Sequence, residues 1–443
     1  MPRRLSLSGL VLALGLCAHA GATDLRLYST FAEVREPVTL TASGGTAAHR
    51  LTFTREAWSL VQPGSLSFFG APLVRIQTLP TDLDWLTTQE GQAVKVLRTG
   101  QPALDGTLVR APDLLVRLVS GEFLNVRRDE LAFTSPPPLD WFQGGVAARF
   151  EVAGQGQVSG EVSYRTQALS WSPRYELEAA GAQAGLAALA EIRNLGGEAF
   201  DARQVDLFAG DVRTFAVAGQ TGAAQATPAP PPLPTAGTAH LSVATRPVTS
   251  AGELRGLQRY TLAGGLKLDR GETLTLPFVQ PKITGFTRYD SISTYFDPQE
   301  RQGRASRHYK FTPDTALPSG PLSVREEGVP VGAVLLPAAQ AGRAVDLDLG
   351  ADNDLRYERR VKRLSQEKDP AGKVLSTTYE VTYTLTSTKT RPTRVQVREQ
   401  VYGRALAVDG QAVQGTQVNV GRRVDVAPGG RAKITFKLKM GVG

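Results

Sequence analysis

The stretch Tyr379-Glu-Val-Thr-Tyr-Thr-Leu-Thr386 alternates apolar and polar side chains residue by residue. The same alternation runs through residues 432–440, where Lys and Thr separate the apolar side chains. Successive side chains of a β-strand point to opposite faces of the sheet, so this pattern indicates strands with one buried and one wet face. The last third of the chain therefore predicts antiparallel sheets of the β-sandwich type.

The alternation weakens toward the N-terminus but does not give way to helical spacing. Residues 85–135 contain five apolar-rich bursts separated by Gly, Pro and Asp turns, a spacing typical of a meander or small barrel. Three prolines at Pro136-Pro-Pro138 end that pattern, because proline cannot continue a strand ladder. We therefore expect an all-β protein with few helices, with small barrel-like modules at 23–138 and a β-rich C-terminal domain at 146–443.

One long segment lacks any strand pattern. Residues 216–245 contain no Asp, Glu, Lys or Arg, and prolines cluster between Pro228 and Pro234. Such a segment cannot bury enough apolar surface to offset the entropy of ordering it. Because strand patterning resumes at Arg259-Tyr-Thr-Leu262, we expect a flexible Pro-rich insertion at about 219–250 within the C-terminal domain.

The N-terminus has the layout of a secretory signal peptide. Arg3 and Arg4 precede an apolar run at 5–16, and small residues follow up to Ala22. We expect cleavage after Ala22, with cleavage after Ala20 as the alternative. The only cysteine, Cys17, lies in this segment; it is disfavoured as a lipid-anchored residue because the bulky Leu16 precedes it.

The expected mature chain is therefore exported and free of cysteine. That composition excludes thiol catalysis and cysteine metal sites. No later apolar run approaches the length of a transmembrane helix. We expect a periplasmic, envelope-associated or extracellular location.

Positive charge is concentrated in one region. The full chain has a formal net charge of +8, and the window 353–404 contains twelve Lys and Arg against six Asp and Glu. The candidate binding patch consists of Arg356, Arg359, Arg360, Lys362, Arg363, Lys368 and Lys373.

This patch has two interpretations. It can bind anionic surface polymers or lipid head groups through charge neutralisation. Alternatively, it is the solvated face and tip of a long hairpin, which keeps a sheet edge soluble. Nucleic acid is not an expected partner, because export separates the chain from it and no stacking aromatics interleave the run.

Four carboxylates, Asp346, Asp348, Asp352 and Asp354, gather around Gly350. Carboxylate oxygens are the ligands that calcium prefers, so these residues are a candidate calcium site. The cluster lacks the spacing and the closing glutamate of an EF-hand loop. The alternative is a strand with two outward carboxylates followed by an Asp-Asn turn.

Trp171, Pro173 and Tyr175 lie close together in the stretch 169–177. A surface tryptophan can stack on a sugar ring. A tryptophan beside a strand-ending proline is more typical of a core side chain whose indole N–H finds a backbone acceptor. We therefore expect these three residues to form part of the structural core.

An ordered series of motifs resembles the C-terminal conserved domain of the mucoidy inhibitor A-like family of secreted bacterial proteins, whose function is unknown. The series covers roughly residues 160–443. It comprises Ser170-Trp-Ser-Pro-Arg-Tyr175, Ile192-Arg-Asn194, Val205-Asp-Leu207, Leu317-Pro-Ser-Gly-Pro-Leu-Ser-Val324, Leu347-x-Leu-Gly350 and Arg359-Arg360. Many relatives carry long coiled-coil helices upstream, and this chain lacks such heptads. The resemblance implies an exported β-rich envelope protein and transfers no catalytic residue.

No catalytic residue is identified from the sequence. Outside the expected signal peptide the histidines are His49, His240 and His308, and no serine lies in a Gly-x-Ser-x-Gly elbow. A Ser-His-Asp assembly is formed in space and leaves no such local signal. We expect no cofactor.

The favoured function is a non-enzymatic β scaffold or interaction module that contacts envelope proteins or anionic polymers. The alternatives are a secreted hydrolase acting on polysaccharide or peptide, and a calcium-dependent adhesion module. The sequence does not indicate an oligomeric state.

Overall fold

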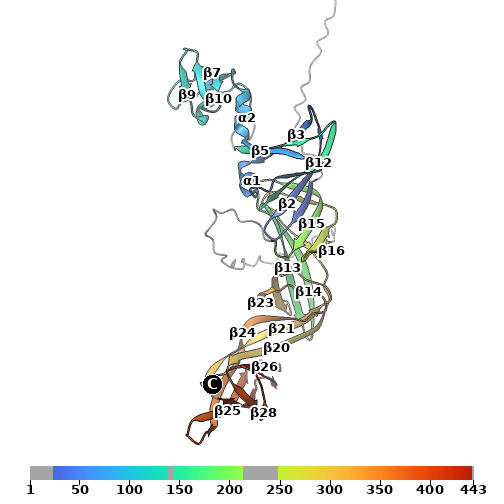
Figure 1. The fold of residues 1–443 in the computed structure, drawn as a ribbon, viewed down its shortest axis with the longest axis vertical. Coiled ribbons are helices and arrows are strands. Elements are labelled where there is room, and N and C mark those ends of the chain that lie inside the picture. Colours follow the sequence, from blue (N-terminus) through green and yellow to red (C-terminus); the bar gives the residue numbers. More distant parts are fainter. Residues whose placement is uncertain (1–22, 138–143, 213–247, 442–443) are drawn as a thin grey trace, which may run out of the picture. The chain divides into compact units, whose positions relative to one another are not determined.

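The computed structural model describes residues 23–137, 144–212 and 248–441, and this part of the chain is all-β (Figure 1). It contains two short α-helices, α1 (Arg55–Leu60) and α2 (Thr81–Thr88), and one 3-10 turn, η1 (Arg128–Glu130). Most of its strand pairs are antiparallel, which confirms the predicted fold class. None of the helices in these residues is long and apolar enough to cross a membrane.

The expected signal peptide, residues 1–22, lies outside the described residues, as do residues 219–247 of the expected insertion. The last residues of that expected insertion, 248–250, begin a strand instead. The chain divides into two compact units. One contains Met1–Trp171 and Ile192–Leu274, and the other contains Ser172–Glu191 and Thr275–Gly443.

The largest sheet of the first unit has eight strands in the order β16-β17-β15-β1-β2-β12-β4, with β18 also paired to β15. Strands β1 and β2 pair with β15 and β12, so residues from both sides of the expected domain boundary at 138–146 share one sheet. The strands are β1 (Thr23–Leu27), β2 (Ala32–Thr41), β4 (Ser67–Phe69), β12 (Gln157–Thr166), β15 (Phe200–Ala209), β16 (Val248–Leu254), β17 (Leu257–Leu262) and β18 (Leu266–Leu268).

The same unit contains two smaller sheets. Strands β3 (Thr46–Thr54), β11 (Gly145–Ala153) and β5 (Leu73–Pro80) form a three-stranded sheet. The five bursts of residues 85–135 form a five-stranded sheet around a core of their own, which includes Val96, Leu108 and Val116. Its strands are β6 (Ala93–Val96), β7 (Leu104–Arg110), β8 (Leu115–Leu118), β9 (Phe123–Asn125) and β10 (Leu131–Phe133).

A further sheet has the order β19-β14-β13-β22-β23. Its strands are β13 (Leu169–Ala180), β14 (Gln183–Asn194), β19 (Thr273–Pro277), β22 (Gly320–Glu326) and β23 (Val329–Leu336). The expected break at Pro173 does not occur, because β13 runs through it. The ladder between β13 and β22 begins at Tyr175, so the missing N–H of Pro173 interrupts no hydrogen bond on that edge.

The side chains around Pro173 are buried. Trp171 is 2% exposed, and its indole N–H donates to the carbonyl of Phe208 at 3.0 Å. The hydroxyl of Tyr175 donates to the carbonyl of Pro318 at 2.8 Å. Buried aromatic side chains whose polar atoms are satisfied by the backbone act as core anchors.

The largest sheet of the second unit has nine strands in the order β28-β27-β30-β25-β24-β21-β20-β26-β29. Strands β24, β21 and β20 run side by side and are among its longest (Figure 1). The strands are β20 (Ile283–Tyr295), β21 (Arg301–Pro313), β24 (Val345–Lys368), β25 (Val374–Ser387), β26 (Thr393–Tyr402), β27 (Ala405–Val408), β28 (Gln411–Ala412), β29 (Gln417–Val426) and β30 (Arg431–Gly441).

The two sides of this sheet differ in the way the alternation predicted. Val381, Tyr383 and Leu385 are buried in a core to which β26, β29 and β30 also contribute. We call this the inner side. Thr382 and Thr384 lie on the opposite, outer side and are half-exposed.

Candidate functional site

Strands β24 and β25 form the hairpin that carries the basic residues singled out in the sequence. Its turn is closed by Asp369, whose N–H donates to the carbonyl of Lys373 at 2.9 Å and whose carboxylate accepts the N–H of Lys373 at 2.8 Å. Six of the seven predicted patch residues are exposed: Arg356, Arg360, Lys362, Arg363, Lys368 and Lys373. The seventh, Arg359, is 0% exposed and cannot belong to a surface patch.

Arg359 lies on the inner side and forms a buried ion pair with Glu399, which is also 0% exposed. The Nε atom of Arg359 lies 3.1 Å from each carboxylate oxygen of Glu399. The guanidinium also donates to the carbonyls of Gln299 and Asp297, at 2.7 and 3.0 Å. Burial alone would lower the pKa of Arg359, but the Glu399 carboxylate outweighs burial and the pKa is raised, so the guanidinium stays ionised.

The exposed cations of the hairpin join others on the outer side. Arg356 lies opposite Thr386 of β25, which in turn lies opposite Arg431 of β30. Residues directly opposite one another point to the same side of a sheet, about 5 Å apart. The same register brings together a surface that we call the basic face: Arg304, Arg356, Arg360, Lys362, Arg431, Lys433, Lys437 and Lys439.

Threonines of β25 separate the cations of the basic face, and carboxylates are few. Glu358 and Glu380 lie within it, and Glu367 pairs with Lys439 at 2.6 Å. Arg363 lies opposite Tyr379, away from this face, while Lys368 and Lys373 lie at the end and turn of the hairpin. The face therefore includes three of the predicted patch residues and adds five that lie on β21 and β30.

The predicted calcium ligands do not converge on one point. The carboxylate of Asp346 contacts His308, and that of Asp348 accepts the N–H of Gly350 at 2.8 Å. Asp352 pairs with Lys389, while Asp354 accepts the hydroxyl of Thr388. In the described residues, no three His, Cys, Asp or Glu side chains are placed to hold a metal ion.

A buried ion cluster joins the inner side of β20 to the segment between β25 and β26. The ammonium of Lys389 lies 2.6 Å from Asp290 and 2.5 Å from Asp352. Thr393 donates its hydroxyl to Asp290 at 2.6 Å. Burial raises the pKa of Asp290, against the opposing effect of Lys389. Because its ammonium and carboxylates pair with one another within the protein, we interpret this cluster as structural.

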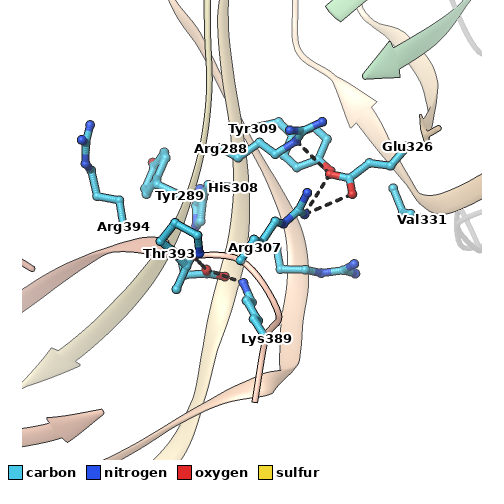
Figure 2. A pocket seen from close by; sticks show the side chains of 13 residues that line it. Arg288, Tyr289, Arg307, His308, Tyr309, Glu326, Val331, Lys389, Thr393 and Arg394 are labelled. Carbon is cyan, nitrogen blue, oxygen red and sulfur yellow. Dashed lines mark hydrogen bonds and ion pairs between the residues drawn. The ribbon is translucent and has the colours of Figure 1, made fainter. Parts of the chain in front are cut away.

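This cluster borders a pocket of about 210 Å³ (Figure 2). Figure 2 shows Lys389 and Thr393 in one part of the pocket and Arg288, Tyr309 and Glu326 in another. Glu326 accepts charge-assisted hydrogen bonds from Arg391, at 3.1 Å, and forms an ion pair with Arg288 at 2.8 Å. Burial raises the pKa of Glu326, but the hydroxyl of Tyr309 and the two arginines outweigh burial and the pKa is lowered.

A second polar cluster lies on the outer side, across β20, β21 and β24. The Oγ atom of Ser291 lies 2.8 Å from Nε2 of His308. The Nδ1 atom of the same ring lies 3.0 Å from Oδ1 of Asp346. The sequence leaves a Ser-His-Asp assembly open and identifies none of its members. Ser291 and His308 are 17 residues apart and Asp346 lies 38 residues further on, so no local motif links them.

The fold and these surfaces define an all-β protein with a basic outer face. Comparison with protein families identifies residues 161–441 with the family described as "Domain of unknown function (DUF4139)". The match covers more than half of the chain, and the chain belongs to this family. A search of curated proteins finds no match.

Proposed function

We propose that the protein is an exported envelope component that binds anionic polymers through its basic face. The observation that carries the proposal is the sign of the charge on the outer side of β21, β24, β25 and β30, where eight cations lie among three carboxylates. Such a surface concentrates polyanions by Coulomb attraction and releases their counterions on contact. The hydroxyls of the intervening threonines can donate to sulfate, carboxylate or sugar oxygens.

The alternative, a charged surface that only protects a sheet edge, does not account for every cation of the basic face. The ladder between β21 and β24 ends at Arg359, so Arg360 and Lys362 lie where β24 pairs only with β25, but Arg356 has ladder partners on both sides. Arg304 lies directly opposite Arg356, and like charges in that position destabilise a sheet. A bound polyanion relieves this repulsion, whereas edge protection offers no reason for it.

The remaining parts of the proposal rest on the sequence. The N-terminal pattern favours export, and the motif series favours kinship with the mucoidy inhibitor A-like proteins. A periplasmic or envelope-associated protein meets anionic surface polymers and other envelope proteins, so both are partners in this proposal. The scattered partners of Asp346, Asp348, Asp352 and Asp354 give no support to calcium-dependent adhesion.

The proposal is tested by heparin chromatography of the full chain and of the double variant Arg356→Glu/Arg431→Glu. Both substituted residues are exposed, and a glutamate at 356 gains an opposite charge in Arg304. The matched control is Lys282→Glu/Arg343→Glu, which makes the same change in net charge at exposed positions outside the basic face.

Earlier elution of the Arg356/Arg431 variant, with the control eluting like the wild type, supports the proposal. Equal retention of all three proteins contradicts it. If the substitutions weaken binding to anionic lipid vesicles but not to heparin, the face is assigned to lipid head groups. That result also contradicts the polymer proposal.

A further inference from the structure

Ser291, His308 and Asp346 have the connectivity of a nucleophile, a general base and an orienting carboxylate. Ser291 contacts one ring nitrogen of His308, and Asp346 contacts the other. An Nδ1–H that donates to Asp346 leaves Nε2 as the acceptor for the serine hydroxyl. Both distances, 2.8 and 3.0 Å, are within the range required for proton transfer.

The imidazole ring is held in this orientation from two directions. Tyr289 stacks on it, with the ring centroids 4.8 Å apart and the planes at 21°. The hydroxyl of Tyr289 also donates to the second oxygen of Asp346. All four side chains lie on strands, and a constellation on strands is held more rigidly than one on loops.

The cluster opens into a cavity of about 600 Å³ on the outer side. Ser291, His308 and Asp346 line it together with Arg398 and Arg423. The serine is therefore accessible to a substrate, and the cavity wall is strongly basic.

The surroundings of Ser291 indicate which substrates the site accepts. Strand β20 is hydrogen-bonded to β21 on one side and to β26 on the other at Ser291, so its backbone N–H groups are committed to the sheet. Stabilisation of an oxyanion then falls to the guanidinium groups of Arg398 and Arg423. Those groups also attract a negative charge elsewhere on the substrate.

We propose that Ser291 is the nucleophile of an esterase site for carboxylic esters carried on anionic molecules. Its Oγ bonds to the ester carbonyl carbon while its proton passes to Nε2 of His308. Collapse of the tetrahedral intermediate breaks the carbon–oxygen bond of the ester, and the leaving alcohol takes that proton. Water then attacks the acyl-serine, gives its proton to His308 and releases the carboxylic acid, after which the proton returns to Ser291.

This activity is separate from polymer binding, although both use the outer side of the same sheet. Arg304 and His308 are an even number of residues apart on β21, so the basic face and the esterase site share that side of the strand. An acidic polymer that carries ester groups meets the requirements of both sites: negative charge for the basic face and an ester for Ser291.

The test is covalent labelling of the full chain with a fluorophosphonate, followed by intact mass measurement and peptide mapping. Wild type is expected to take up one label, on Ser291, and Ser291→Ala none. The control Ser293→Ala removes the other serine that lines the cavity and should label like wild type. Replacing His308 with Gln should slow labelling at least about 100-fold, the loss typical of a missing general base.

Failure of the folded wild type to label at Ser291, or equal labelling of the His308→Gln variant, overturns the proposal. The substrate class is tested with two activated esters, 4-nitrophenyl succinate and 4-nitrophenyl acetate. A higher kcat/KM for the anionic succinate supports the basic wall, and a preference for acetate contradicts it. Neither the labelling experiment nor the ester kinetics measures heparin retention. A failure of this inference can therefore be distinguished from a failure of the polymer proposal.

Discussion

Replacing Arg359 with Met should destabilise the protein strongly, although Arg359 belongs to the run of cations in the hairpin. The substitution removes the guanidinium and its hydrogen bonds to Glu399 and to the carbonyls of Gln299 and Asp297. Glu399 remains 0% exposed and, among the described residues, retains the hydroxyl donors of Tyr383 and Thr294. Removing one partner of a buried pair costs about 3–5 kcal/mol, because the other charge stays buried and uncompensated.

The assay is urea unfolding at neutral pH, with the midpoint and slope compared between variants. The matched control is Arg360→Met, since Arg360 is the next residue and its side chain is 68% exposed. Substitutions at such surface positions usually change stability by less than about 0.5 kcal/mol. The double variant Arg359→Met/Glu399→Leu should recover much of the loss, because it removes both charges together. Similar midpoints for the Arg359 and Arg360 variants would refute this account of the buried pair.

Three further predictions concern other parts of the chain. Trp171→Ala should lower the free energy of unfolding by about 3–5 kcal/mol through cavity formation, measured by denaturant unfolding; unchanged stability would argue against a core role. Glu326→Gln should destabilise the protein at neutral pH, because the lowered pKa of Glu326 contributes stability above its unfolded value of roughly 4.3. That difference should shrink as the pH falls through the folded pKa, and a constant difference from pH 7 to 3 would contradict the assignment. Gly320→Ala should lower the thermal midpoint, since its Cβ would lie 2.4 Å from the carbonyl oxygen of Pro173, whereas Gly332→Ala meets only one side-chain atom at 3.7 Å and serves as the control.

The strand pattern of the C-terminal third could be predicted because each strand has one buried and one wet face. Tyr379-Glu-Val-Thr-Tyr-Thr-Leu-Thr386 alternates in the sequence, and Val381, Tyr383 and Leu385 are buried in the structure. The same alternation indicates a buried position for Arg359, although its charge alone suggests a surface position. Arg359 is in phase with the buried Leu355 and the partly buried Val361, so its position in the strand indicated the inner side.

The proposed functional surfaces could be predicted only in part, because they depend on which strands are neighbours. Lys433 and Lys437 join the hairpin cations only because β30 pairs with β25. The contact between His308 and Asp346 depends on the pairing of β21 with β24, whose register shifts between Ser306 and His308. Neither the pairing nor this irregularity leaves a pattern within a single strand.

The central claim is that the basic face binds polyanions, and the salt dependence of heparin affinity tests it most directly. Each cation that neutralises a polymer charge releases counterions, so the slope of log K against log salt reflects the number of contacts. Relative to wild type, Arg356→Glu/Arg431→Glu should show weaker binding and a slope shallower by about 1–2, with Lys282→Glu/Arg343→Glu unchanged. Identical slopes for the three proteins would contradict the claim.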